Sequence, residues 1–299
     1  MQRLAGRLVE VLLIDNRPER GGIEAEPASL AGLASVTTEL LRRGTSSREP
    51  DVFAEELDYL GARMTASVGE QSAEVEMQFL SKDLERAADL LVDALLRPAF
   101  PTKEVDKVIA QHIDESRAIK DNPQQANLLY FRPFFFGASH PYGRPPNGDE
   151  RRLGRIRRED IAAFHKRMFV GRNMIVTAAG DLAPAEVRPK LAGLFGSIPA
   201  GEAYSWLSGV ALPQRPKPRL LLVDKPDSTQ TYFVIAQPGI RRADPGRVTL
   251  RLVNTLFGGR FTSMLNDELR VNSGLTYGAF SSVQEDRLTG AIRIVSYTK

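Results

Sequence analysis

The chain has 299 residues, 42% of them hydrophobic, which suits one large or two medium domains with proper cores. It contains no cysteine, so disulfides, thiol catalysis and cysteine-ligated zinc are all excluded. The 40 basic and 37 acidic side chains give a net charge of +3, which does not indicate a nucleic-acid-binding surface. Arginines between Arg151 and Arg158 are therefore interpreted as a solvated helix face.

Nothing in the chain predicts a membrane protein or fixes a compartment. No apolar run approaches the roughly 18 residues that a membrane-spanning helix needs. Residues 1–16 have no apolar core or cleavage site typical of a signal peptide. We therefore expect a soluble protein, with cytoplasm and periplasm both open.

The first two thirds of the chain mix hairpins with consecutive helices. An apolar strand is predicted at 8–15, followed by a loop to Pro27 and a helix that begins at Leu33 and is stopped by Gly44. Asp51 is predicted to cap a helix to Leu60 whose inward residues include Val52. A hairpin is predicted at 63–68 and 73–80, and further helices at 83–96, 102–120, 126–136, 158–168 and 184–195, with a strand at 173–179. This order favours an α+β fold over a doubly wound parallel sheet.

A proline-rich stretch divides the chain. Residues 199–218 contain prolines at 199, 213, 216 and 218, a composition typical of a linker. We therefore predict a first domain at 1–198, a linker at 199–218 and a second domain at 219–299. The second domain is predicted to have strands at 219–224, 231–237, 275–283 and 290–297 and helices at 247–257 and 261–269.

The second half repeats landmarks of the first. Gly44, the pair Glu56-Leu57, and Gly61 recur 214, 212 and 213 residues later, as Gly258, Glu268-Leu269 and Gly274. Three landmarks at nearly one offset indicate a duplication. A repeat of that length needs roughly 200 residues by the same offset, so we expect one complete copy and a truncated second copy.

The helix after Gly32 has two unlike stripes. One stripe is apolar and is predicted to face the core; it consists of Leu33, Val36, Leu40 and Leu41. The opposite stripe is polar and consists of Ser35, Thr38, Glu39 and Arg42. The polar stripe is the first candidate functional site.

The frame around this helix, Gly32-Leu33-Ala34 before it and Gly44-Thr45 after it, resembles that of the pitrilysin/insulinase family of metallopeptidases. In that family the five positions 35–39 carry H-x-x-E-H, whose two histidines hold zinc while the Glu polarises water. Here both histidines are replaced, by Ser35 and Glu39, and the Glu by Thr38. Further landmarks of the family lie in the family's order at 121–123, 139–144, 160–165 and 173–181. The resemblance implies an insulinase-like (mitochondrial-processing-peptidase-like) fold.

The third zinc ligand of the family is a Glu about 76 residues beyond the motif, and Glu115 matches that position. One carboxylate cannot hold zinc alone, because zinc sites use three or four ligands. A site for another metal at Glu39 and Glu115 is the alternative, and two helix-surface acids are the favoured interpretation. We therefore predict that this chain binds no metal or cofactor.

Other catalytic arrangements find little support. His112, His140 and His165 are not spaced four apart, although His112 and Glu115 lie at i and i+3. A lone inward His is more often a hydrogen-bonded core residue than a ligand. There is no G-x-S-x-G elbow for a serine hydrolase.

The second candidate site is the corner 270–277. A helix is predicted to end at Arg270, the chain turns at 272–274, and Tyr277 is predicted on the following strand. A guanidinium and a phenol at one corner suit a peptide carbonyl or its oxyanion. This looks like the Arg/Tyr pair that the family's second domain contributes to substrate binding; an ion-paired Arg and a half-buried Tyr are the structural alternative.

The resemblance implies a divided function. The family includes two-chain enzymes in which one subunit keeps the zinc motif and the other only the Arg/Tyr pair. This chain looks like that second subunit: inactive alone, binding peptide, and partnered by a catalytic chain that carries H-x-x-E-H and zinc. The alternative is a structural or binding paralogue with no role in proteolysis. A metal-independent hydrolase has no group of residues behind it.

Overall fold

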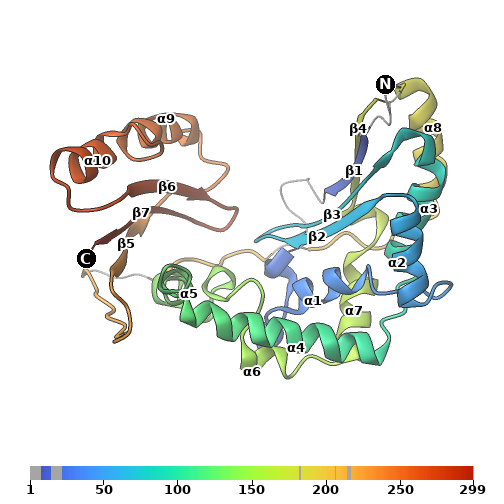
Figure 1. Ribbon diagram of the computed structural model, residues 1–299, viewed down its shortest axis with the longest axis horizontal. Coiled ribbons are helices and arrows are strands. Elements are labelled where there is room, and N and C mark those ends of the chain that lie inside the picture. Colours follow the sequence, from blue (N-terminus) through green and yellow to red (C-terminus); the bar gives the residue numbers. More distant parts are fainter. Residues whose placement is uncertain (1–7, 15–21, 182, 206, 214–216, 299) are drawn as a thin grey trace, which may run out of the picture. The chain divides into compact units, whose positions relative to one another are not determined.

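The computed structural model describes residues 8–14, 22–181, 183–205, 207–213 and 217–298 (Figure 1). The chain forms two compact units, Met1–Asp114 with Pro146–Trp206, and Glu115–Pro145 with Leu207–Lys299. The second unit therefore includes residues 115–145 from the middle of the sequence, which the predicted domain division places in the first domain. The last residue of the predicted first strand and the first half of the predicted loop, residues 15–21, lie outside the described residues.

The first unit is built on a four-stranded sheet. Its strands are β1 (Leu8–Ile14), β2 (Arg63–Val68), β3 (Ala73–Leu80) and β4 (Ile175–Gly180), in the order β2-β3-β1-β4 and all antiparallel. On β3 the alternate residues Val75, Met77 and Phe79 are buried, as expected of a strand with one face on the core. The predicted β2-β3 hairpin is confirmed.

Two helices of the first unit contact this sheet, and two further helices pack on those two (Figure 1). Both α1 (Leu33–Leu40) and α3 (Leu84–Leu96) contact β3, while α7 (Arg158–Met168) packs on α1 and α8 (Pro184–Phe195) on α3. The remaining helices of this unit are α2 (Pro50–Tyr59) and α6 (Glu150–Leu153), and α4 (Thr102–Ala118) starts in this unit. Short 3-10 turns lie at 22–25, 28–30, 81–83 and 171–173.

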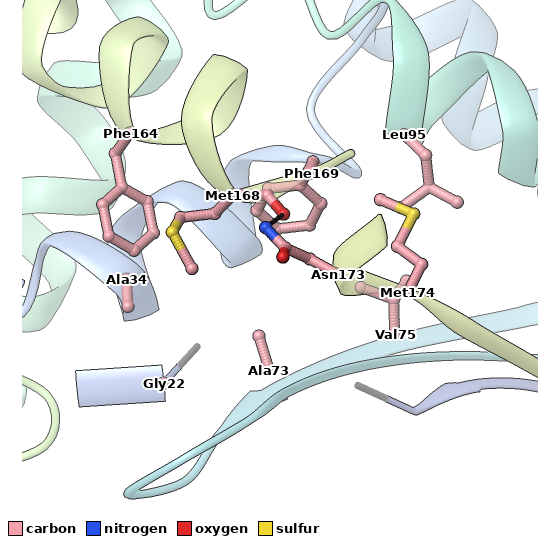
Figure 2. Close-up of a pocket in the computed structure, with 10 residues that line it drawn as sticks. All are labelled: Gly22, Ala34, Ala73, Val75, Leu95, Phe164, Met168, Phe169, Asn173 and Met174. Carbon is pink, nitrogen blue, oxygen red and sulfur yellow. Dashed lines mark hydrogen bonds between the residues drawn. The ribbon is translucent and has the colours of Figure 1, made fainter. Parts of the chain in front are cut away.

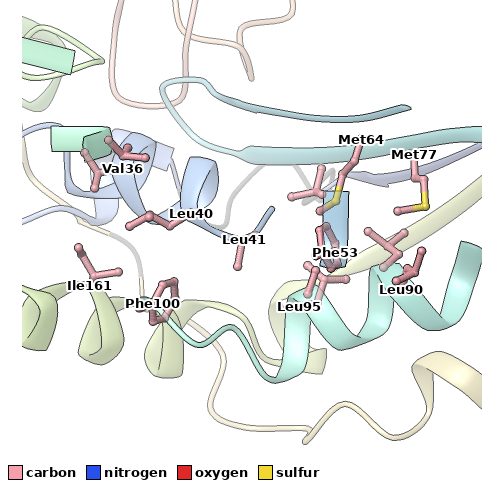
Figure 3. Packing of buried hydrophobic residues seen from close by; sticks show 14 of the residues in the cluster. Val36, Leu40, Leu41, Phe53, Met64, Met77, Leu90, Leu95, Phe100 and Ile161 are labelled. Carbon is pink, nitrogen blue, oxygen red and sulfur yellow. The ribbon is translucent and has the colours of Figure 1, made fainter. Parts of the chain in front are cut away.

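The core of the first unit is one cluster to which α1 contributes (Figure 3). Val36, Leu40 and Leu41 are fully buried, as predicted for the apolar stripe. They belong to one cluster with Phe53 of α2 and Ile161 of α7, among other residues. Burial of a Leu or Phe side chain stabilises a fold by about 1.5–3 kcal/mol, so the helix that carries positions 35–39 also stabilises the core.

Several predicted helix boundaries need correction. α1 ends at Leu40 rather than at Gly44, although Gly44 at φ +95° turns the chain beyond it. α2 begins at Pro50, because proline suits the first helical position, so Asp51 lies in the first turn and is not the cap. Val52 on that helix is 45% exposed and does not face the core as predicted.

The second unit holds a three-stranded antiparallel sheet. Its strands are β5 (Thr231–Pro238), β6 (Ala279–Glu285) and β7 (Gly290–Thr298), in the order β5-β7-β6. α9 (Arg247–Phe257) and α10 (Met264–Asn266) contact β6 on one face, and α5 (Pro123–Phe136) contacts β5 on the other (Figure 1). Phe131 and Phe136 of α5 form a small core with Tyr142 of the 3-10 turn Pro141–Gly143 and with Leu288 and Ala291.

Predictions for this unit hold for its strong elements and fail at its turns. Residues 219–224 form no strand, and their apolar side chains from Leu220 to Val223 are exposed. The predicted helix 261–269 is instead the short α10 followed by a π-helical turn, Asp267–Asn272. The strand predicted from 275 begins only at Ala279, because Gly274 at φ +62° and the hydroxyl of Thr276 hold the chain in a turn.

Part of the first unit and the second unit share one topology, which confirms the α+β fold and the duplication with a truncated second copy. β2-β3-β1 in the first sheet corresponds to β6-β7-β5 in the second, since a strand, two helical segments and a hairpin follow in the same order. Gly61 and Gly274 end the second helical segment of each copy with nearly equal φ of +57° and +62°. Among the described residues, no helix is long and apolar enough to cross a membrane.

Candidate functional site

The N-terminal end of α1 is held by a carboxylate and by a loop. The two oxygens of Glu26 accept hydrogen bonds from the backbone amides of Ala34 (2.7 Å) and Gly32 (3.1 Å), which satisfies donors that a helix start leaves free. A Cβ on Gly32 would lie 2.9 Å from the Cα of Gly148 and 3.1 Å from the carbonyl of Asn147. Glycine at 32 therefore lets the loop 146–148 press directly against this end of the helix.

The first motif position, Ser35, is closed by the same loop. Its hydroxyl lies 3.1 Å from the carbonyl of Pro146, to which it donates, and 3.3 Å from the side-chain oxygen of Asn147. The residue is only 8% exposed. An imidazole is much larger than a hydroxymethyl group, so a ligand at this position would need the loop to move.

The second position, Thr38, is turned inward. It is 1% exposed, and its hydroxyl donates to the carbonyl of Ala34 at 2.8 Å. Thr37 makes the same type of bond to Leu33 at 2.7 Å. The hydroxyl-bearing part of the polar stripe is therefore buried, with Thr38 bonded to a carbonyl of its own helix and Ser35 to the carbonyl of Pro146. A back-bonded, buried hydroxyl cannot polarise water as the family's Glu does.

The third position, Glu39, is ion-paired. One carboxylate oxygen accepts from Arg42 at 2.5 Å and from Arg43 at 3.1 Å. Arg43 also lies 3.8 Å from Glu104 of α4, so the network links two helices of the first unit. Two guanidinium groups already neutralise the carboxylate where a metal would need it.

These donors do not fit zinc. The three motif positions offer a hydrogen-bonded hydroxyl, a back-bonded hydroxyl and an ion-paired carboxylate, and none is a histidine. Glu115 is exposed and falls in the second unit. Among the described residues, no group of three or more His, Asp or Glu side chains is arranged to hold a metal ion. We therefore derive no chemistry through a metal on this chain.

A small cavity lies between α1, β3 and α7 (Figure 2). Its volume is about 40 Å³, and it is lined by Ala34, by Ala73 and Val75 of β3, and by apolar side chains of α7 and the residues after it. The amide of Asn173 is the polar side chain in its lining, and it donates to the carbonyl of Met168 at 3.1 Å. Ligand sites usually measure about 300–1,000 Å³, so this cavity is too small to hold a peptide.

The two histidines with shifted pKa values serve the fold. Burial lowers the pKa of His140 to about 4, helped by Arg144 and Arg132, and its Nδ1 accepts from the amide of Tyr142 at 3.1 Å. Burial also lowers the pKa of His165 to about 4, and its Nε2 lies 2.8 Å from the carbonyl of Leu95. Both are neutral near pH 7, as expected of core histidines.

The corner 270–277 is more open. The guanidinium of Arg270, in the π-helical turn, lies 4.6 Å from the ring centre of Phe261. Tyr277 is 63% exposed, and its ring stacks at 6.4 Å on that of Tyr297. Tyr277 precedes β6 by two residues instead of lying on the strand as predicted. No described hydrogen bond joins Arg270 to Tyr277. Each of the two side chains lies against a different aromatic ring.

Sequence reasoning missed what holds this corner. The hydroxyl of Thr276 accepts from the amide of Gly278 (3.1 Å) and lies 2.5 Å from the carbonyl of Tyr297 on β7. Ser296 donates to the same hydroxyl from 3.1 Å. The signal available in the sequence was a Thr two residues before a Gly, which is a turn pattern, but its partners come from another strand.

Comparisons with known proteins agree with this picture. The family model described as insulinase (peptidase family M16) matches residues 20–132, and the peptidase M16 inactive domain matches residues 155–299. Uncharacterized zinc proteases of Mycobacterium leprae and Mycobacterium tuberculosis (strain H37Rv) are 27% and 28% identical over 91% of this chain. The matches cover 61% and 62% of those relatives, so the chain spans about three fifths of their length.

Solved structures give the same result. A peptidase M16 inactive domain from Pseudomonas fluorescens is 26% identical with a TM-score of 0.86, covering 98% of this chain and 69% of that one. Pitrilysin is 19% identical with a TM-score of 0.72, covering 99% of this chain and 32% of that one, which shows the fold alone. The chain is a homologue of the insulinase/pitrilysin family of peptidases.

Proposed function

We propose that this chain is a non-catalytic, peptide-binding member of the insulinase family that works beside a catalytic chain. The partner would carry H-x-x-E-H and zinc, and this chain would hold the peptide backbone. The observation that carries the proposal is the state of the three motif positions, Ser35, Thr38 and Glu39, which are all engaged in internal contacts.

The polar corner supports the peptide-binding half of the proposal. Tyr277 presents a hydroxyl that makes no hydrogen bond within the described residues, on a ring that is 63% exposed. Arg270 offers up to five N–H donors, none of them used in a described hydrogen bond. Donors of this kind suit peptide carbonyls. The structural alternative, a paralogue without a role in proteolysis, does not require either group to be accessible.

The first experiment concerns metal and activity. The dialysed chain should contain no stoichiometric zinc by elemental analysis and should cleave no peptide, because its motif positions offer no His ligand and no base. One tightly held zinc per chain would overturn the proposal.

The second experiment concerns the partner. Affinity capture from the native source, with identification of any co-purified chain that carries H-x-x-E-H, should yield a two-chain enzyme that can be reconstituted. Tyr277→Phe removes one hydroxyl and keeps the ring. Turnover should fall at least tenfold, since a donor to a developing oxyanion contributes roughly 10²–10³ in kcat, while the melting temperature should not change.

Tyr59→Phe is the matched control, because Tyr59 is also exposed (77%) but lies in the first unit on α2. It should change neither turnover nor melting. Full turnover with Tyr277→Phe, in a complex that remains assembled, would favour the purely structural paralogue.

A further inference from the structure

We infer that Tyr232, Tyr297 and Tyr277 form a subsite for an aromatic side chain of a bound peptide. The inference rests on the proposed peptide-binding function and adds the substrate class. The three tyrosines come from β5, from β7 and from the turn before β6, so the sheet order β5-β7-β6 places them in one row.

The rings of this row are stacked. Tyr232 and Tyr297 are directly opposite each other in the β5-β7 register, with ring centres 5.4 Å apart and planes at 21°. Tyr277 continues the row from Tyr297 at 6.4 Å and 19°. Aromatic pairs are favourable at centroid distances of about 4.5–7 Å in offset stacking. The row therefore consists of three nearly parallel rings.

One end of the row is open. Tyr277 stacks on Tyr297 on one side, and no other ring or cation contact involves it within the described residues. With 63% of Tyr277 exposed, a flat ring has room to continue the stack. Phe280, 45% exposed, is opposite Val295 in the β6-β7 register and so lies on the same face as Tyr297 by alternation. The surroundings are thus aromatic.

The open ring is held in place before any ligand arrives. Thr276 accepts hydrogen bonds from the amide of Gly278 and from Ser296, and it lies 2.5 Å from the carbonyl of Tyr297, to which it donates. The residues on both sides of Tyr277 are therefore tied to β7. A surface that is already ordered loses less conformational entropy on binding.

An aromatic side chain fits this surface better than a cationic one. A cation is also attracted to a ring face, but it must give up hydration to reach a surface whose other members are Tyr297, Tyr232 and Phe280. The ring of an aromatic peptide side chain loses only apolar hydration on binding and gains a stacking contact with the row. We expect stacking to tighten binding by about three- to tenfold over an aliphatic group of equal size.

The test compares matched peptides on the whole chain by calorimetry. Three extended alanine-serine peptides carry, at one central position, phenylalanine, cyclohexylalanine or arginine. Phenylalanine and cyclohexylalanine have nearly the same apolar size but differ in the π system. The unmodified chain should bind the phenylalanine peptide three- to tenfold tighter than the cyclohexylalanine peptide, and tighter than the arginine peptide.

Two variants localise the effect. Tyr277→Leu removes the exposed ring, and Tyr297→Leu removes the ring behind it; each should bring the ratio of the two dissociation constants near one. Thr276→Val should reduce the ratio by releasing the turn, and Thr276→Ser should restore it. Tyr59→Leu on α2 should leave the ratio unchanged.

The outcomes separate this inference from the proposed function. Equal binding of the phenylalanine and cyclohexylalanine peptides would overturn the aromatic subsite and leave peptide binding intact. Tighter binding of the arginine peptide, or a ratio that survives Tyr277→Leu, would also overturn the subsite. Binding of none of the three peptides would overturn both.

Discussion

Two helices in corresponding places of the duplication, α1 and α9, show how differently one local plan can be used. Seven of the eight residues of α1 are buried, including the polar Ser35, Thr37 and Thr38. None of the residues of α9 is buried, and its exposed side chains include Val248, Leu252, Val253, Leu256 and Phe257. Both helices were predicted from the sequence, and α1 was predicted with an apolar stripe that faces the core. The stripe specifies the helix, but the elements packed around it decide what is buried.

The loops that follow the two helices differ in the chemistry that holds them. After α1, the side chain of Asp93, on α3, accepts from Thr45 (2.6 Å), Ser47 (2.7 Å) and Arg48 (2.6 Å). After α9, a neutral amide does the corresponding work: the side chain of Asn266, on α10, donates to the carbonyl of Phe261 at 2.7 Å and accepts from the amide of Ala279 at 3.2 Å. The loop after α1 is held by a charged group and the loop after α9 by a group that does not titrate, so pH should act on the first loop more than on the second.

The largest effect is expected from shortening one leucine side chain in each of the two helices. Leu40 is fully buried and Leu252 is 64% exposed. Leu40→Ala should lower the free energy of unfolding of the first unit by about 2–5 kcal/mol, because it leaves a cavity in the core. Leu252→Ala should cost less than about 0.5 kcal/mol. Urea unfolding, with hydrogen exchange to assign each loss to its unit, measures both. Equal losses would show that α9 is buried in solution and would end the comparison.

The next effect depends on pH. Burial alone would raise the pKa of Asp93, but hydrogen bonds from Thr45, Ser47, Arg97 and Arg48 outweigh it and lower the pKa from 3.8 to about 2. A carboxyl with a lowered folded-state pKa contributes stability above its unfolded pKa, and that contribution is lost as pH falls through the folded pKa. Between pH 4 and pH 2 the first unit should therefore lose about 1–2 kcal/mol, allowing for the partly exposed arginines.

Hydrogen exchange of the loop after α1, followed across this pH range, measures the loss. Asp93→Asn should be less stable at neutral pH and should flatten the acid slope. Asp89→Asn is the matched control, since Asp89 pairs with the same Arg48 at 3.1 Å but is 53% exposed. A variant Asp89→Asn that flattens the slope as much as Asp93→Asn would show that Arg48, not the buried carboxylate, sets the pH response.

The sequence predicts the elements of this protein better than its site. Local sequence patterns predict α7, α8 and α9 at their observed bounds. Such local signals do not report what packs on a helix. The polar stripe of α1 was predicted as a candidate site, but the sequence pattern did not predict the loop 146–148, more than a hundred residues away, that closes on Ser35. The environment of Tyr277 likewise depends on β7, which follows it in the chain.

The smallest effect concerns two glycines and tests where the two copies are alike. Gly61 and Gly274 have φ of +57° and +62°, and a Cβ added at either position would meet no atom within 4 Å. Alanine would therefore cost only the left-handed backbone strain, about 1 kcal/mol in each unit. Gly193 in α8 is the control, because its surroundings are equally open but its φ is ordinary, so Gly193→Ala should stabilise the helix by about 0.5–1 kcal/mol. Urea unfolding of the three variants decides the point. Equal costs at Gly61 and Gly274 would show that the duplication preserves backbone geometry where burial has diverged, whereas a neutral Gly274→Ala would show that the turn before Tyr277 can relax, which would also weaken the case for an ordered aromatic row.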